Sequence, residues 1–149
     1  MNQHLEILRQ DAVACFQAGV AAANPYSAVK RHLQFSEQSL QIDERCGNWR
    51  QIHLIAFGKA ATAMLRAAMD VIPHQYLAST PIAVTNDENY CQIDNALVIA
   101  SGHPLPDQRG LTAAKTIAEQ LKSCQSGDLV LCLISGGGSA LLPYPMAGI

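Results

Sequence analysis

The chain has 149 residues, of which 49% are hydrophobic and 15% charged. This length and composition fit one domain with a buried core and exclude an intrinsically disordered chain, which would carry more charge and fewer apolar residues. The formal net charge is −2 and the pI is about 6.2. Because there is no basic excess, we expect neither nucleic acid nor an anionic membrane as a partner.

The N-terminus and the cysteines both indicate a cytoplasmic protein. Met1-Asn2-Gln3-His4 lacks the basic and apolar regions of a secretory signal, and the apolar stretch at residues 129–134 is far too short to span a bilayer. The five cysteines are widely spaced and form no CxxC pair, which is typical of reduced thiols. We expect Cys15, Cys124 and Cys132, which lie in apolar or amphipathic stretches, to be small core residues.

The first part of the chain predicts two helices. Residues 5–23 place apolar side chains at helical spacing, and Asn24-Pro25 ends this helix. The same pair is a good N-cap and first turn for a second, shorter helix that reaches about residue 33. These two helices would flank or cap the domain that follows. Residues 34–48 are polar, contain one turn signal near Gly47, and predict no regular element.

From residue 51 onward, short apolar strands alternate with helices. The pattern predicts strands at residues 51–57, 81–85, 96–100 and 128–134, and helices at residues 60–72 and from Pro106-Asp107 to about residue 123. Since these strands are apolar throughout, both faces of the sheet should be covered. We therefore predict an α/β fold: a parallel sheet with helices on both faces, preceded by one or two N-terminal helices.

The strongest motif follows the last strand. Ser135-Gly136-Gly137-Gly138-Ser139 places three glycines at the carboxyl edge of the sheet, where ligands bind in open α/β folds. Backbone N–H groups without neighbouring Cβ atoms can approach an anion closely, and the two serines add hydroxyl donors. The motif is not a Walker A loop, a dinucleotide fingerprint or a GxSxG nucleophile elbow. We favour an anion-binding loop over a ligand-free turn, because a turn needs only one glycine.

A lysine follows the strand at residues 51–57 and points to the same edge. Gly58-Lys59 places a cation beside free backbone amides, which suits a phosphate or carboxylate group. The helix dipole disfavours a lysine at a helix N-terminus unless an anion is present. For Lys59 alone, a solvated surface position is an equally good interpretation; together with the glycine loop, the functional interpretation is favoured.

A third polar loop follows the strand at residues 96–100. It contains Gly102-His103-Pro104 and ends at Asp107, for which we expect N-capping of the next helix. His103 can position a substrate or move a proton, or it can hydrogen-bond within its own loop. The other histidines show no ligand spacing, so the sequence predicts no metal ligand.

Together these segments resemble the glycerate 2-kinase family, of the DUF4147 type, some of whose members carry the older label of hydroxypyruvate reductase. The matching segments are Ala56-Phe57-Gly58-Lys59-Ala60-Ala61 with Met64, Gly102-His103-Pro104-Leu105-Pro106-Asp107, and Ser135-Gly136-Gly137-Gly138-Ser139-Ala140-Leu141. Each motif is modest singly, but the three in this order are highly specific, and the resemblance covers most of the chain.

The resemblance implies a Rossmann-like first domain and ATP-dependent phosphorylation of D-glycerate at the 2-hydroxyl with Mg²⁺, giving 2-phosphoglycerate. It implies that Lys59 is catalytic or stabilises phosphate, and that Gly58, His103 and the loop from Ser135 to Ser139 bind substrate or phosphate. Phosphoryl transfer depends chiefly on positioning and on charge stabilisation by cations and amides, so the implied reaction agrees with the motifs.

Family members are considerably longer. We therefore expect residues 1–149 to be a partial N-terminal domain that is inactive alone, with the rest of this domain and a C-terminal domain absent. Two other functions stay open: an NAD(P)H-dependent hydroxypyruvate reductase and a non-catalytic sugar-phosphate-binding module. The lack of a GxGxxG motif after any predicted strand argues against the reductase. Nucleotide preference and oligomeric state are open, and the choice of hydroxyl rests on the resemblance.

Overall fold

The computed structural model describes residues 3–146. Residues 1–2 and 147–149, to which the predictions about the two ends of the chain refer, lie outside the described part. The fold begins with two helices, α1 Gln3–Ala22 and α2 Pro25–His32. The Asn24 side chain caps α2 by accepting a hydrogen bond from the Ser27 N–H at 3.0 Å, as the sequence predicted.

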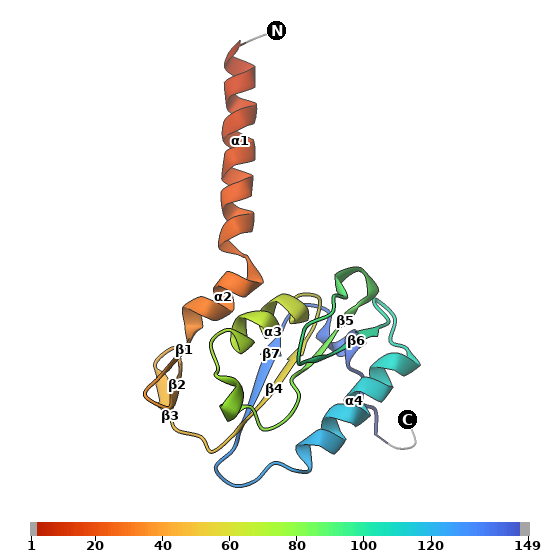
Figure 1. Ribbon diagram of the computed structural model, residues 1–149. Helices are drawn as coiled ribbons and strands as arrows, with labels where there is room; N and C mark the ends of the chain where they lie inside the picture. Colours follow the sequence, from red (N-terminus) through yellow and green to blue (C-terminus); the bar gives the residue numbers. More distant parts are fainter. Residues whose placement is uncertain (1–2, 147–149) are drawn as a thin grey trace.

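We expected the two N-terminal helices to flank or cap the domain, but helix α1 does not cap it. It projects away from the rest of the molecule, and only α2 joins it to the body (Figure 1). Its described side chains are exposed along the whole helix, including Phe16 at 72%. Although α1 is the longest helix within residues 3–146, neither it nor any other helix there meets the length and apolarity that crossing a membrane requires.

Residues 34–48, for which we predicted no regular element, lie largely in a small antiparallel sheet. Its strands are β1 Leu33–Ser36, β2 Ser39–Ile42 and β3 Arg45–Gly47, in the order β1-β2-β3. Glu37 and Gln38 adopt φ values of 48° and 64° at the first turn. A hairpin turn of that kind usually contains Asn-Gly or Asp-Gly. This turn contains Glu37-Gln38 instead, so nothing in the sequence indicated it. Leu40 is buried and anchors this sheet to the core.

The main sheet has four parallel strands and confirms the predicted α/β class. The strands are β4 Ile52–Phe57, β5 Ile82–Asn86, β6 Leu97–Ser101 and β7 Leu129–Ile134. They lie in the order β6-β5-β4-β7, and every neighbouring pair is parallel. This arrangement is the 3-2-1-4 order of the first strands of a Rossmann fold. The chain reverses its direction of travel across the sheet between β4 and β7, which makes their carboxyl ends the topological switch point.

Helices cover both faces of this sheet. Helix α3 Ala61–Met69 packs against β4, β5 and β7, whereas α4 Gln108–Leu121 packs on the opposite face against β5 and β6 (Figure 1). The core divides in the same way: Leu54 and Leu65 are buried on the α3 side, and Ile55 and Ile117 on the α4 side. The remaining short elements are η1 His74–Tyr76, η2 Asp87–Asn89 and α5 Gly138–Leu141.

Strand β7 departs from the predicted two-sided burial. Leu131 packs in the α3-side core, but Val130, Cys132 and Ile134 on the α4 side are exposed. The prediction that three cysteines are core residues is accordingly wrong: Cys15 and Cys132 are exposed, and Cys124 is half-buried. Cys15 lies on the projecting helix α1. Cys132 lies on a stretch of sheet that no helix of the described chain covers.

Candidate functional site

The candidate site lies at the switch point between β4 and β7. Gly58 ends β4 with a φ of 116°, and a Cβ atom there would lie 2.2 Å from Ser135 Oγ and 2.5 Å from the Ser135 carbonyl oxygen. Both the left-handed backbone and the close approach of the two loops therefore require glycine at this position. The next residue, Lys59, leaves the strand with its side chain exposed.

Three hydrogen bonds join the loop after β4 to the loop after β7. The Ser135 N–H donates to the Phe57 carbonyl at 3.0 Å, the Lys59 N–H donates to the Gly136 carbonyl at 2.9 Å, and the Ala60 N–H donates to Ser135 Oγ at 3.0 Å. The hydroxyl of Ser135 is thus an acceptor for the first turn of α3. Gly58, Lys59 and Ser135 form one connected rim of the sheet, although Ser135 is far from the other two in the sequence.

Gly137 brings the third predicted segment to this rim. Its φ is 87°, and a Cβ atom there would lie 3.0 Å from His103 Cδ2 and 3.5 Å from Lys59 Cε. The side chains of His103 and Lys59 therefore converge on the middle glycine of the loop. His103 follows β6, and β5 and β4 lie between β6 and β7 in the sheet, so this contact joins loops from its two edge strands.

The other positions of the glycine loop differ from one another. Gly136 is exposed, and a Cβ atom there would meet nothing within 4 Å. Gly138 is buried, and a Cβ atom there would lie 3.0 Å from the Phe57 ring. Ser139 is exposed in the single turn of α5. The motif therefore presents Gly136, Gly137 and Ser139 toward the open side and uses Gly138 for packing.

The site offers hydrogen-bond donors that the described chain leaves free. Within residues 3–146, no backbone carbonyl receives the N–H groups of Gly136, Gly137, Gly138 or Ser139. In the same part of the chain, the Lys59 ammonium has no carboxylate within 4.0 Å, and the His103 ring makes no hydrogen bond. Free amides beside an unpaired cation form a site suited to a phosphate or carboxylate group.

Two buried polar residues at the end of β5 complete the rim, and the sequence reasoning missed them. Thr85 and Asn86 are buried at the carboxyl end of this strand, between β4 and β6. Thr85 Oγ1 donates to the Lys59 carbonyl at 3.4 Å, so it contacts the backbone that carries the candidate lysine. The sequence signal that could have indicated polar site residues here was the run of polar residues directly after the apolar strand predicted at residues 81–85.

An ion-pair network borders the site on the α4 side. Arg109 donates to both carboxylate oxygens of Asp87, at 2.7 and 3.0 Å, and to Asp107 at 2.7 Å. Asp107 also accepts from the Gly110 N–H at 3.1 Å, so it caps α4 as predicted. The hydrogen bond from Arg109 is the main cause that lowers the pKa of Asp107 to about 2.

The carboxylates near the site do not fit a dedicated magnesium centre. Asp87 and Asp107 are both paired with Arg109, and Glu88 accepts a hydrogen bond from Asn86. Mg²⁺ prefers free carboxylate and water oxygens, so no described residue is assigned as its ligand. A group of metal-binding residue types does occur at the opposite, amino edge of the sheet, where His53, Cys124 and Asp128 lie within 4.8 Å of one another.

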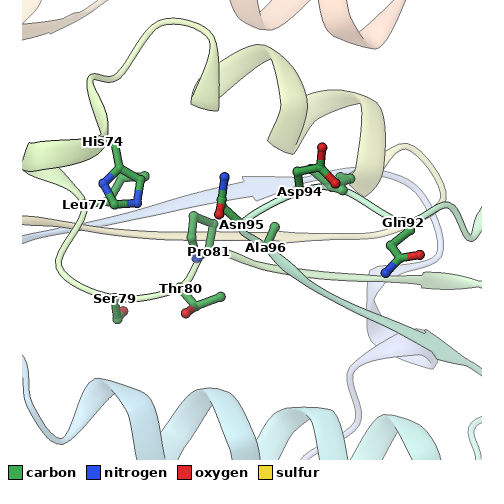
Figure 2. Close-up of a pocket in the computed structure, with 10 residues that line it drawn as sticks. His74, Leu77, Ser79, Thr80, Pro81, Gln92, Asp94, Asn95 and Ala96 are labelled. Atoms are coloured by element: carbon green, nitrogen blue, oxygen red, sulfur yellow. The ribbon is translucent and has the colours of Figure 1, made fainter.

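A cavity of about 550 Å³ also lies at the amino edge (Figure 2). The residues that line it come from segments 74–81 and 92–96, which directly precede β5 and β6. Figure 2 shows His74 and Leu77 at one end of the lining and Asp94 and Gln92 at the other, with Asn95 between them. Since parallel strands share their direction, this cavity and the switch point lie at opposite ends of the sheet. The cavity is therefore separate from the candidate site.

Comparisons with known proteins show which family the chain is similar to. The model of the domain of unknown function DUF4147 matches residues 11–149. Glycerate 2-kinase of Pyrococcus horikoshii is 32% identical over 143 residues, which cover 95% of this chain and 32% of that protein. The chain thus spans about one third of the length of the curated relatives it matches.

Two crystal structures share the fold. The PH0495 protein of Pyrococcus horikoshii superposes with a TM-score of 0.83 at 31% identity, over 95% of this chain and 32% of that one. Glycerate kinase of Thermotoga maritima gives a TM-score of 0.77 at 27% identity, over 97% of this chain and 32% of that one. The arrangement of strands and loops described above therefore occurs within proteins about three times as long.

Proposed function

Because the chain belongs to the DUF4147 family, we propose that it forms part of the N-terminal domain of a glycerate 2-kinase, which transfers the γ-phosphate of ATP to the 2-hydroxyl of D-glycerate and gives 2-phosphoglycerate. The observation that carries the proposal is the convergence of Lys59 and His103 on Gly137 at the switch point. Similarity to proteins named glycerate 2-kinase and glycerate kinase supports the substrate and the reaction.

Each residue has a role that follows from its chemistry. The free N–H groups from Gly136 to Ser139 bind phosphate oxygens, and the Lys59 ammonium neutralises charge that develops during phosphoryl transfer. His103, which lies on the same side of Gly137 as Lys59, holds a substrate or phosphate oxygen. Gly58 and the Ser135 hydroxyl fix the backbone that carries Lys59 and bring the two loops together. Mg²⁺ would neutralise charge on the phosphates of bound ATP, and we assign no described residue to hold it.

The chain by itself should be inactive. In the described part the candidate site is one open rim, on which Lys59, Gly136 and Ser139 are exposed. Phosphoryl transfer needs a site that excludes water and holds both substrates in line. The relatives are about three times as long, and we propose that the rest of such a protein supplies the other side of the cleft.

A chimera tests the proposal. In the Pyrococcus horikoshii relative, the matched third would be replaced by this chain, and ADP release with D-glycerate would be measured together with the identity of the product. We expect turnover that forms 2-phosphoglycerate, a loss of at least about 100-fold on Lys59→Ala, and no turnover by the 149-residue chain alone. A folded chimera without turnover, or turnover by the chain alone, would count against the proposal.

The alternatives make different predictions in the same assay. A hydroxypyruvate reductase would oxidise NADH when hydroxypyruvate is added, and a non-catalytic module would bind 2-phosphoglycerate in a chimera that releases no ADP. A non-catalytic module would not need both the Gly58-Lys59 turn and the segment from Gly102 to Asp107, so the presence of both favours the kinase. A cytoplasmic location goes with this proposal, since the five free cysteines suit a reducing compartment.

A further inference from the structure

His53 is a buried histidine without a hydrogen-bond partner. It lies on β4, where alternation with Leu54 places its side chain on the α4 side of the sheet, and this side chain is 2% exposed. Within residues 3–146, neither ring nitrogen makes a hydrogen bond. Buried polar atoms are usually paired, because burial without a partner costs free energy. The ring is therefore suited to a ligand that the described residues do not supply.

The Asp128 carboxylate lies beside this ring and is also buried, with an exposed fraction of 1%. Its Oδ2 accepts hydrogen bonds from the Gln125 N–H and from the Arg50 guanidinium, each at 2.9 Å. Its Oδ1 is buried and has no partner among the described residues. His53 Nε2 lies 3.5 Å from Oδ2, which exceeds the roughly 3.2 Å limit of ordinary N–H···O hydrogen bonds. A carboxylate oxygen and a ring nitrogen thus remain free for a third group.

Cys124 completes a set of three metal-binding residue types. It lies in the turn between α4 and Asp128 and is half-buried, and one ligand atom from each of the three residues lies within 4.8 Å of the others. Two ligand atoms on one tetrahedral zinc ion are about 3.4–3.6 Å apart, so closing the set requires movements on the order of 1 Å. The sequence shows no ligand spacing here, because His53 is far from the other two residues along the chain.

Backbone hydrogen bonds already hold the segments that carry these ligands. The Leu129 N–H donates to the Gln51 carbonyl at 2.9 Å, which joins the starts of β7 and β4. The Asp128 N–H donates to the Gln125 carbonyl at 3.0 Å, which closes the turn after α4. The Arg50 contact on Oδ2 holds the carboxylate from outside, as the hydrogen bonds around metal-binding carboxylates commonly do. Only side chains would have to adjust to bind an ion.

We propose that His53, Cys124 and Asp128 bind one Zn²⁺ ion at the amino edge of the sheet, with water as the fourth ligand. Imidazole, thiolate and carboxylate are the ligands that zinc uses in proteins, and three of them leave one position open. One thiolate and one carboxylate balance the charge of Zn²⁺, so the ion adds no net charge to this buried place. The ion links β4, the end of α4 and the start of β7. The inference does not depend on the kinase reaction, whose site lies at the carboxyl edge.

Cobalt substitution tests this inference. Co²⁺ takes tetrahedral zinc sites, and its bond to a thiolate gives a charge-transfer absorption band in the near ultraviolet. The metal-free 149-residue chain would be titrated with Co²⁺ after serine has replaced the other four cysteines, through Cys15→Ser, Cys46→Ser, Cys91→Ser and Cys132→Ser. We expect the band to saturate at one Co²⁺ per chain and to disappear when Zn²⁺ displaces the cobalt.

Two further substitutions in this four-serine protein assign the ligands. Cys124→Ala removes the thiolate, and His53→Leu replaces the imidazole with an apolar side chain that suits a buried strand. Competition with a chromophoric chelator should show zinc affinity reduced at least about tenfold in each, because the loss of even an outer partner of a metal ligand has an effect of that size. Ser126→Ala, in the exposed turn between two of the ligands, is the control and should bind zinc within about twofold.

Stability gives a second readout. An ion that binds only the folded state stabilises it, so zinc should raise the urea midpoint of the four-serine protein and leave that of its Cys124→Ala variant unchanged. Circular dichroism without metal verifies that each variant is folded. If the four serines prevent folding, Cys124→Ala is compared with Cys91→Ala in the otherwise unmodified chain, since both cysteines are half-buried.

The absence of a cobalt–thiolate band would overturn the inference. A loss of zinc affinity smaller than about tenfold in either ligand variant would overturn it as well. Zinc binding by the chain together with a folded chimera that releases no ADP would support this inference and count against the proposed kinase function. An active chimera together with a chain that binds no zinc would do the reverse.

Discussion

The backbone N–H of Lys59 donates a hydrogen bond of 2.9 Å to the carbonyl oxygen of Gly136. This bond joins the loops after β4 and β7 and also orients the glycine loop. In a planar trans peptide the carbonyl and the following N–H point in opposite directions. With the Gly136 carbonyl turned toward Lys59, the N–H of Gly137 is turned away from it. The position of the lysine and the direction of one free donor are therefore fixed together.

The charge of Lys59 should matter for anion binding but not for folding. We expect Lys59→Met to weaken binding of 2-phosphoglycerate to the chain about tenfold, because one charge-assisted contact is lost. The free energy of unfolding should not change, since the side chain is exposed and makes no ion pair in the described structure. Titration followed by NMR chemical shifts measures the affinity. Lys115→Met, on the exposed face of α4, is the control and should bind as the unmodified chain does.

Gly58 should be indispensable for stability. Gly58→Ala places a Cβ atom 2.2 Å from Ser135 Oγ at a φ of 116°, so both sterics and backbone strain oppose it. We expect the free energy of unfolding to fall by at least about 2 kcal/mol in urea denaturation. Gly19→Ala is the control, because a Cβ atom there meets nothing within 4 Å and alanine favours a helix. Equal stability of the two variants would contradict the packing described at Gly58.

The sequence was sufficient to predict the order of the main elements and the edge of the sheet where the site lies. Apolar runs of strand length that alternate with helical patterns predicted β4 to β7, and the glycines at Gly58 and Gly137 marked strand ends. The small antiparallel sheet escaped prediction because Glu37 and Gln38 adopt positive φ without a typical turn sequence. Its burial comes from tertiary contacts of single residues such as Leu40, which a local pattern does not reveal.

Two features of the site could not be predicted from the sequence, because they depend on contacts between distant segments. The apolar pattern of β7 indicated burial on both faces, but Cys132 and Ile134 are exposed because no described element covers them. The three glycines of the loop looked equivalent in the sequence. They differ because His103 lies against Gly137 and the Phe57 ring lies against Gly138, while Gly136 faces open space.

This difference gives a prediction within the glycine loop itself. Gly137→Ala should lower the free energy of unfolding by about 1–2 kcal/mol, because its φ is 87° and its Cβ atom would press on His103. Gly136→Ala should change it by less than about 0.5 kcal/mol, since no atom lies within 4 Å and its φ is not in the left-handed region. Thermal unfolding of the two variants provides the comparison. Similar losses for both would contradict the difference between the two positions.

The Asp107–Arg109 pair should make stability depend on pH in acid. Because Arg109 lowers the pKa of Asp107 from 3.8 to about 2, the folded state holds this carboxylate in its charged form more strongly than the unfolded chain does. The resulting stabilisation is fully present above about pH 4 and is lost as the pH falls toward 2. Asp107→Asn retains an N-cap but loses the charge, so its deficit in unfolding free energy should be constant near neutral pH and shrink in this acid range. Urea denaturation between pH 7 and pH 2 measures the deficit. In an Arg109→Gln background the same substitution should show a much smaller pH dependence, and an unchanged dependence there would mean that Arg109 is not its cause.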